Sequence, residues 1–373
     1  MRHVNVTIVC SSLIRQGPTN VIYNMLEAYY KNKGPIIYKI VTISRENPEN
    51  TRIKDFEKLG ISIVSCNQPR GLVSLLHLNK IKSVIKETSP DIVLSYGFRA
   101  DCIIGLINLT GVVKVSSLFN NPYDDFKQFG KYKGLIMSKI LLRLYNNFDK
   151  IIVCSKFIAK KIEKSNLPIE IIYTGVPTDF FIPSSINRTN IRKSMGINST
   201  DKIWLFIGNL IPRKNPLFLI DAFNNLRLSN HHLFIMGNGP LMDECIARKK
   251  NNKNIVLLGA KPGTLDYLQI ADYYISSSTS EGFPTAVLEA MSVDVTPVLS
   301  DIEPHIEMIE MFSKDCIFIN NSIESLSHII SHIEDVTYDK KPRQYLLKNF
   351  SSDLMQKKYC DLLIQLCSFR EME

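Results

Sequence analysis

Short apolar runs alternate with longer helical patterns along most of this chain, and the alternation limits the folds that it can adopt. Each half of the chain holds six such runs, which have the length and apolar composition of buried strands. Buried strands that alternate with helices indicate a parallel sheet covered on both sides. The predicted strands are residues 4–10, 36–43, 61–65, 92–95, 112–116 and 151–154, then 203–207, 233–236, 255–258, 273–276, 296–299 and 316–319.

A chain of 373 residues is too long for one ordinary core, so the sequence predicts two domains. A segment with Pro, Gly and Ser around residues 174–185 interrupts the alternation and marks the linker. The predicted domains are residues 1–180 and 181–349, and a helical stretch at 350–373 ends the chain. Helices are also predicted at 19–31, 74–88, 131–146 and 156–165.

The stretch SSSTSEGFPTAVLEAM, residues 276–291, places two carboxylates eight positions apart, at Glu281 and Glu289. Pro284 suits the first turn of a helix, which would begin directly after an apolar strand. The free N–H groups at such a helix start favour phosphate, and carboxylates accept hydrogen bonds from sugar hydroxyls. One glutamate is therefore expected to hold a transferred sugar and the other a ribose. The spacing alone fits an ordinary acidic strand–helix corner equally well.

A second motif follows the first predicted strand of the second half. Arg213 and Lys214 lie there between a strand and a helix. Breaking a sugar–diphosphate bond adds negative charge to the distal phosphate, and two cations so placed would stabilise that charge. The alternative is a pair of solvated surface cations. The position of the pair between a strand and a helix, upstream of the two glutamates, favours the phosphate-binding role over this alternative.

The stretch EGFPTAVLEAM resembles the E-x7-E signature of the family 4 glycosyltransferases, which have the GT-B fold. The resemblance continues in FIGNLIPRKNPLFLIDAF, FIMGNGPLMDE, NIVLLGA and PVLSDIEPHIEMI, and it covers about residues 150–310. Over the first half only the order of elements agrees. The resemblance implies an α/β fold of two Rossmann-like doubly wound domains facing a central cleft, with the last helix crossing back to the first domain.

The resemblance also implies roles for individual residues. Members of the family carry an arginine directly after the loop glycine, where this chain has Asn209; Lys214 matches the family's lysine, and Arg213 is the candidate replacement. The implied catalytic residues are Arg213, Lys214 and Glu281. The implied donor-binding residues are Gly17, Asn209, Gly237, Leu258, Gly259, Gly282, Phe283, Pro284, Thr285 and Glu289. On the acceptor side stand Arg99 and either Asn120 or Asn121, where many relatives carry a histidine.

Metal and redox chemistry have little support in the sequence. The chain contains no Asp-x-Asp pair, which fits a metal-independent reaction without a cofactor. Its eight cysteines are scattered singly without C-x-x-C spacing, so reduced thiols are expected. There is no apolar run near 18 residues and no signal-peptide pattern, so we expect a cytoplasmic protein.

Positive charge is concentrated in the first half of the chain. Residues 1–180 carry 25 Lys and Arg against 14 Asp and Glu, or +11, whereas residues 181–373 carry 20 against 22, or −2. Within residues 127–164, ten cations are interleaved with apolar residues near helical spacing: Tyr132, Leu135, Ile136, Ile140, Leu141 and Leu144. Such a basic amphipathic helix is typical of a membrane-surface element, although a core helix with a solvated lysine face has the same pattern. No nucleic-acid motif accompanies the charge.

Together these features predict a retaining hexosyltransferase that moves a sugar from a nucleotide sugar to a lipid-linked saccharide. The resemblance places such a reaction in lipopolysaccharide, O-antigen or capsule assembly, and the charge suggests a peripheral place on the inner face of the plasma membrane. A nucleotide-sugar epimerase and a non-catalytic nucleotide-sugar binding protein remain as alternatives.

Overall fold

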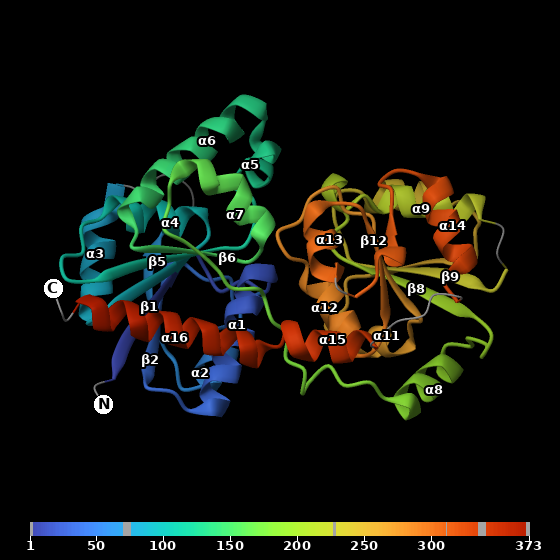
Figure 1. The fold of residues 1–373 in the computed structure, drawn as a ribbon, viewed down its shortest axis with the longest axis horizontal. Helices are drawn as coiled ribbons and strands as arrows, with labels where there is room; N and C mark the ends of the chain where they lie inside the picture. The colour runs from blue at the N-terminus through green and yellow to red at the C-terminus, as the bar shows by residue number, and fades with distance from the viewer. Residues whose placement is uncertain (1–2, 70–75, 227–228, 311, 335–340, 371–373) are drawn as a thin grey trace. The chain divides into compact units, whose positions relative to one another are not determined.

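The computed structural model describes residues 3–69, 76–226, 229–310, 312–334 and 341–370. The chain divides into two compact units, which are considered separately (Figure 1). The first unit comprises Met1–Gly175 and Ser352–Glu373, and the second comprises Val176–Ser351. The sequence places this division a few residues later, at 180/181, and begins the last helix at 350.

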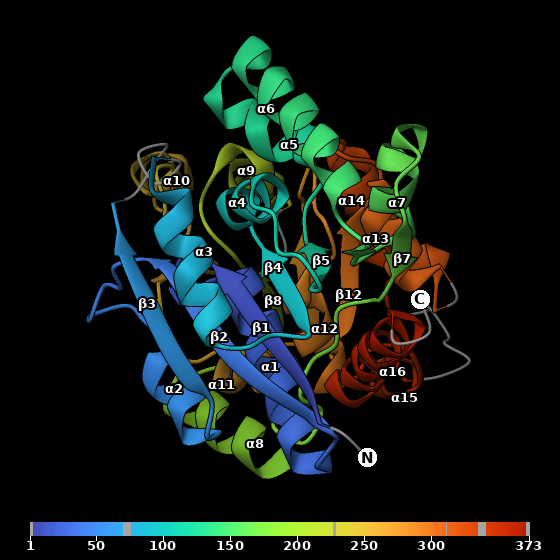
Figure 2. The same ribbon diagram turned by 90° about the vertical axis from the view of Figure 1, so that its left-hand side faces the viewer.

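The first unit is built on a seven-stranded parallel sheet with the order β3-β2-β1-β4-β5-β6-β7 (Figure 2). The strands are β1 Val4–Cys10, β2 Ile36–Ser44, β3 Ser62–Gln68, β4 Ile92–Tyr96, β5 Val113–Leu118, β6 Lys150–Val153 and β7 Ile169–Ile171. The helices of this unit are α1 Gly17–Asn32, α2 Ile53–Lys58, α3 Leu78–Glu87, α4 Phe98–Leu106, α5 Pro122–Asp125, α6 Lys131–Leu144, α7 Lys156–Ile162 and α16 Ser352–Arg370.

The C-terminal helix α16 completes the core of the first unit by packing against α1. Met355, Tyr359 and Leu363 are buried in the same apolar cluster as Ile8 of β1. The hydroxyl of Tyr359 lies 3.0 Å from that of Ser117 at the end of β5. The last helix therefore belongs with the N-terminal residues, although the whole second unit separates them in sequence.

The second unit is built on a six-stranded parallel sheet with the order β10-β9-β8-β11-β12-β13. Its strands are β8 Lys202–Ile207, β9 His231–Met236, β10 Ile255–Gly259, β11 Tyr273–Ser276, β12 Thr296–Ser300 and β13 Ile317–Phe318. Its helices are α8 Ser185–Ser194, α9 Pro216–Asn225, α10 Met242–Lys249, α11 Leu265–Ile270, α12 Thr285–Ser292, α13 Glu303–Ile309, α14 Ile323–His332 and α15 Pro342–Asn349.

Both sheets have the doubly wound order that the alternation predicts, with switch points between β1 and β4 and between β8 and β11. In open parallel sheets, ligands bind where the strand order reverses, beside the carboxyl ends of the strands. The loops after β8 and β11 therefore form the expected site of the second unit. That the two units face one cleft stays a prediction.

A few elements differ from their sequence-based bounds. The short strand β7 was not expected, and Cys316 lies in a 3-10 turn before β13 rather than in the strand. Helix α3 begins at Leu78, and residues 74–75 of the predicted helix lie outside the described part of the chain. In the described ranges, no helix combines the length and the apolar composition needed to cross a bilayer.

Candidate functional site

Two cations and a carboxylate meet at the switch point of the second sheet. The ammonium of Lys214 contacts Oε1 of Glu281, and Nη1 of Arg213 lies 3.0 Å from Oε2 of the same residue. The Glu281 side chain is only 6% exposed, whereas those of Lys214 and Arg213 are 19% and 32% exposed. The three residues that the sequence identifies as catalytic candidates therefore form one cluster, with its cations nearer to solvent.

Local backbone structure holds the two cations in place. They lie in the 3-10 turn Pro212–Lys214, and Asn215 then adopts a left-handed conformation (φ 52°, ψ 45°) that turns the chain into α9. Asparagine tolerates this conformation better than most residues. The loop after β11 is fastened to the turn, because the N–H of Thr279 donates to the carbonyl of Arg213 at 2.8 Å. The hydroxyl of Ser277 also donates to the carbonyl of Asn215, at 2.9 Å.

The surroundings of Glu281 keep it ionised. Burial alone would raise the pKa of its carboxyl group, but the charges of Lys214 and Arg213 and hydrogen bonds from Lys214 and Ser278 hold it at about 2. The Ser278 hydroxyl donates to Oε1 at 2.7 Å. Glu281 is therefore a fixed anion that balances two cations.

Glu289 lies in a different environment, in the middle of α12. Its Oε2 accepts a hydrogen bond from the hydroxyl of Thr264 at 3.1 Å. Burial, only partly offset by this bond, raises its pKa to about 7. The two glutamates of the motif therefore differ in protonation near neutral pH. Glu281 is ionised, whereas Glu289 is divided between its protonated and its ionised form.

The start of α12 differs slightly from its predicted form. The helix begins at Thr285, and Pro284 is its N-cap residue rather than part of the first turn. Pro284 has extended backbone angles and makes no side-chain capping bond. Gly282 and Phe283 are buried, and the ring of Phe283 packs against Phe350 at 5.2 Å between centroids. The Phe283 ring therefore belongs to the core, so any contact of Phe283 with a ligand would come from its backbone N–H and carbonyl groups.

Glycines allow the loops after β8 and β9 to pack closely. A Cβ atom on Gly237, whose φ is 148°, would lie 1.8 Å from the carbonyl oxygen of Gly208, and one on Gly239 would lie 2.5 Å from that of Leu210. The N–H of Gly237 donates to the carbonyl of Gly259 at 2.9 Å. Three successive loops at the edge of the sheet are thereby joined. Asn209 lies within this arrangement, and Leu258 and Gly259 line a surface hollow together with Met242 and Ile246 of α10.

A buried histidine lies behind the cluster. Nδ1 of His305 is 3.1 Å from the hydroxyl of Ser300, which donates to the carbonyl of Ser278 at 2.7 Å. Burial lowers the pKa of His305 to about 4, so the imidazole is neutral at neutral pH. The histidine and serines thus support the loop that carries Ser278 and Glu281.

In the first unit, the predicted residues lie near the carboxyl edge of the sheet. Gly17 is exposed at the start of α1. Arg99 donates to the hydroxyl of Ser44 and, at 2.6 Å, to the carbonyl of Pro69. Asn121 is buried and caps α5, where it accepts a hydrogen bond from the Tyr123 N–H at 3.1 Å. Arg99 and Asn121 therefore have structural partners.

Asn120 remains the more accessible of the two asparagines. Its amide donates to Asp125 at 3.2 Å. It lines a hollow to which α1, α4, β5, α5 and α6 contribute, including Pro18, Gly97 and Leu141.

Two polar partners in the second unit were not identified from the sequence. They are Ser278, which bonds Glu281, and Thr264, which bonds Glu289. His305, which follows Pro304 at a helix start, was expected to be structural or a neighbour of the donor site, and the structure buries it. The serine-rich run before Glu281 is the only local signal for the first of them. Among the residues with described positions, no three His, Cys, Asp or Glu side chains are grouped so that they could hold a metal ion.

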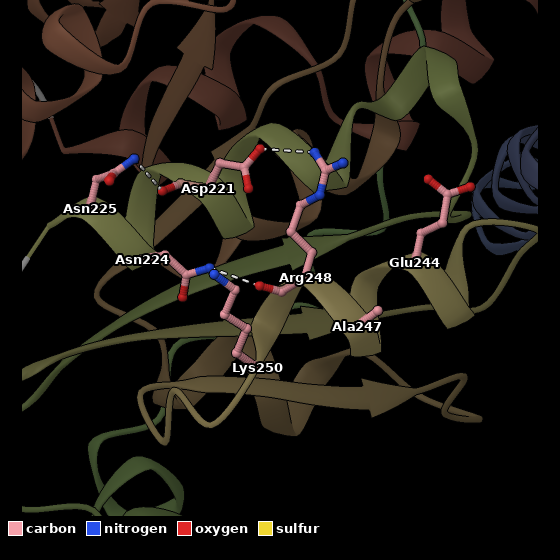
Figure 3. A pocket seen from close by; sticks show the side chains of 7 residues that line it. All are labelled: Asp221, Asn224, Asn225, Glu244, Ala247, Arg248 and Lys250. Carbon is pink, nitrogen blue, oxygen red and sulfur yellow. Dashed lines mark hydrogen bonds and ion pairs between the residues drawn. The ribbon is translucent and has the colours of Figure 1, made fainter.

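Another pocket of the second unit lies between α9 and α10 (Figure 3). It is lined near the C-terminal ends of both helices, and Arg248 pairs there with Asp221 at 2.9 Å. In a parallel sheet these helix ends lie opposite the edge that binds ligands. This pocket is therefore separate from the cluster around Glu281.

Comparisons with known proteins cover both units. Residues 187–350 match the family model described as glycosyl transferases group 1, and residues 16–180 match glycosyltransferase family 4. The chain is 25% identical over 217 residues to UDP-Gal:alpha-D-GlcNAc-diphosphoundecaprenol alpha-1,3-galactosyltransferase from Escherichia coli, with 55% of this chain and 54% of the relative covered. It is 26% identical over 252 residues to the capsular polysaccharide biosynthesis glycosyltransferase CapH from Staphylococcus aureus, with 64% and 67% covered.

The match thus spans little more than half the length of the E. coli relative. Among solved structures, HepE from Anabaena in complex with UDP and glucose has a TM-score of 0.80 and 16% identity, with 97% of this chain and 100% of that chain covered. At this identity the likeness shows the fold, and it confirms the predicted GT-B class with two Rossmann-like domains.

Proposed function

The chain belongs to the glycosyltransferases, since it matches the family 4 model over residues 16–180 and the group 1 model over residues 187–350, and we propose that it transfers a hexose from a nucleotide sugar to a saccharide acceptor. The observation that carries the proposal is the cluster of Arg213, Lys214 and Glu281 at the switch point of the second sheet. This position is where a doubly wound domain binds nucleotide phosphates.

In the proposed reaction, the diphosphate of the donor competes with Glu281 for both cations. Charge that develops on the distal phosphate is then stabilised by Lys214 and Arg213, which are already fixed in position. No metal ion or cofactor is assigned a role. Arg213 takes the part that the arginine missing at Asn209 has in relatives.

The two glutamates are assigned to different hydroxyl groups. Glu281, released from one of its cations, accepts hydrogen bonds from the sugar, and Glu289 accepts them from the ribose. The reaction retains the anomeric configuration, and the departing diphosphate accepts the proton of the incoming hydroxyl on the same face of the sugar. No protein nucleophile is needed in this scheme.

The acceptor is proposed to be a lipid-linked saccharide used in capsule, O-antigen or lipopolysaccharide assembly. Two observations support this choice. Relatives of the chain act on a diphosphoundecaprenol-linked sugar or take part in capsular polysaccharide biosynthesis. The first half of the chain also carries the whole excess of positive charge, which suits an anionic acceptor at the cytoplasmic membrane surface.

The donor is tested by thermal unfolding with a panel of nucleotide sugars, starting with UDP-hexoses, because a bound ligand raises the unfolding midpoint. The stabilising donor is then incubated with lipid-diphosphate saccharides, and the product is analysed for linkage and anomeric configuration. Lys214→Ala and Glu281→Ala should each remove transfer while the protein stays folded. Full transfer in either variant contradicts that residue's role, and donor isomerised without acceptor contradicts the proposed reaction.

A further inference from the structure

Helix α6 has small residues on its inner face, where a core helix usually has large ones. Gly134 and Ser138 are buried, and a Cβ atom on Gly134 would lie 2.4 Å from the carbonyl oxygen of Phe126. The Ser138 hydroxyl donates to the carbonyl of Pro122 at 3.0 Å. The helix therefore lies close against the backbone of the preceding turns, and only Leu141 and Leu142 add large buried side chains.

The large apolar side chains of this region face solvent instead. The exposed fractions are 80% for Tyr132, 59% for Ile136 and 49% for Ile140, which recur every four residues and so form one stripe along the helix. Leu135 lies beside this stripe and is 44% exposed, and Phe129, which ends the 3-10 turn before the helix, is 53% exposed. Figures 1 and 2 both show α6 at the periphery of the first unit. Tyr132, Leu135, Ile136 and Ile140 form the apolar face of α6.

Positive charge borders the apolar face. Lys131, Lys133, Lys139 and Arg143 are exposed on the same helix. No aspartate or glutamate occurs between Asp125 and Asp149. An exposed apolar stripe bordered by cations is typical of helices that lie in the headgroup region of a membrane.

We propose that the apolar face of α6 inserts into the surface of an anionic membrane, with the bordering cations on the lipid headgroups. Charge complementarity favours this occupant over a second copy of the chain, because paired copies would bring two sets of like charges together. The small inner residues fit the same conclusion, since the large apolar side chains of α6 contribute little to the core.

The inference deepens the proposed function by naming the partner of the first unit. Leu141, on the inner face of α6, lines the same hollow as Asn120 at the carboxyl edge of the first sheet. A helix lying in the membrane surface would therefore hold this hollow close to lipid-linked saccharides. The membrane contact itself needs neither donor nor acceptor, so it can be tested apart from the transfer reaction.

The full chain is mixed with vesicles of phosphatidylcholine alone or with about one third phosphatidylglycerol, and the bound fraction is measured by sedimentation. Binding should need the anionic lipid and should weaken with added salt. The double variant Ile136→Ser/Ile140→Ser and the triple variant Lys131→Gln/Lys133→Gln/Lys139→Gln should each reduce partitioning about tenfold or more. The matched control Ile186→Ser/Ile246→Ser changes two exposed isoleucines of the second unit and should bind as the parent chain does.

Circular dichroism and thermal unfolding establish that each variant is folded, and insertion is read from the fluorescence of Tyr132→Trp with lipid-borne quenchers. Absence of binding to anionic vesicles overturns the proposal, as does an equal loss in the control variant. Self-association that disappears in Ile136→Ser/Ile140→Ser would instead assign the face to a second copy. Vesicle binding without any glycosyl transfer leaves this inference standing and refutes the proposed function.

Discussion

The ammonium of Lys214 contacts the carboxylate of Glu281 directly, although 67 positions separate the two residues in the sequence. They reach each other because parallel strands β8 and β11 are neighbours and both end at the same edge of the sheet. The contact makes the positions of the cations and of the carboxylate interdependent.

Single replacements of Lys214 and Glu281 should not have additive effects on stability. Lys214→Met leaves Glu281 buried with one cation fewer and should lower the free energy of unfolding by about 2 kcal/mol. The double variant Lys214→Met/Glu281→Gln should lose about 1–2 kcal/mol less of its unfolding free energy than the losses of the two single variants added together. Urea unfolding of the parent chain, Lys214→Met, Glu281→Gln and the double variant gives the coupling energy between the two side chains. A coupling energy near zero would contradict the contact.

Acid should weaken the protein through Glu281. The pKa of this carboxyl is lowered from 4.5 to about 2, so its contribution is complete above pH 4.5 and is lost as the pH falls towards 2. A shift of this size corresponds to about 3 kcal/mol. Urea unfolding between pH 7 and pH 3 should show a steeper loss for the parent chain than for Glu281→Gln. Other acid-sensitive groups, such as His305, are present in both proteins, and parallel curves would refute the prediction.

Donor binding should depend on the protonation of Glu289. Its pKa is raised from 4.5 to about 7 in the folded protein. The contribution of this carboxyl group to the free energy of unfolding therefore decreases as the pH rises from 4.5 through 7. If the ionised carboxylate accepts the ribose hydroxyls, donor affinity should increase about tenfold between pH 6 and pH 8, in step with the ionised fraction. Calorimetric titration of the donor into Glu289→Gln should show a weak affinity that stays the same between pH 6 and pH 8. An equal pH dependence in both proteins would assign the titration to another group.

The packed loops after β8 and β9 should not tolerate a methyl group. Gly237→Ala places a Cβ atom 1.8 Å from the carbonyl oxygen of Gly208, at a positive φ that disfavours alanine. It should lower stability by about 1–3 kcal/mol and weaken donor binding. Gly263→Ala is the matched control, because nothing lies within 4 Å of its Cβ position. Thermal unfolding and donor titration of both variants test this, and a neutral Gly237→Ala would mean that the loops can separate without cost.

The sequence predicted the doubly wound sheets well because each strand is a short apolar run with a clear local pattern. It missed β7, since Ile169–Ile171 is only three residues long and is specified by pairing with β6. Arg213, Lys214 and Glu281 were predicted from their own motifs to act together, and the structure brings the three side chains into contact. Ser278 and Thr264 were missed because their roles depend on contacts made only in the folded chain.

Side-chain direction was the least predictable property. The spacing of Tyr132, Ile136 and Leu141 allowed either a core helix or a membrane-surface helix. The structure buries Leu141 and exposes the other two, because Gly134 fixes which side of α6 approaches the backbone of Phe126. The sequence also gave no sign that Arg99 and Asn121 have structural partners in the first unit.

The return of α16 to the first unit matters for engineering new specificity. A chimera that takes only the segment equivalent to residues 1–175 from a relative would pack the α16 of this chain against the relative's α1. Met355, Tyr359 and Leu363 would then meet a foreign surface, and the grafted domain would lose part of its own core. Exchange of the first unit between related chains therefore needs two crossover points, one near residue 175 and one near residue 352.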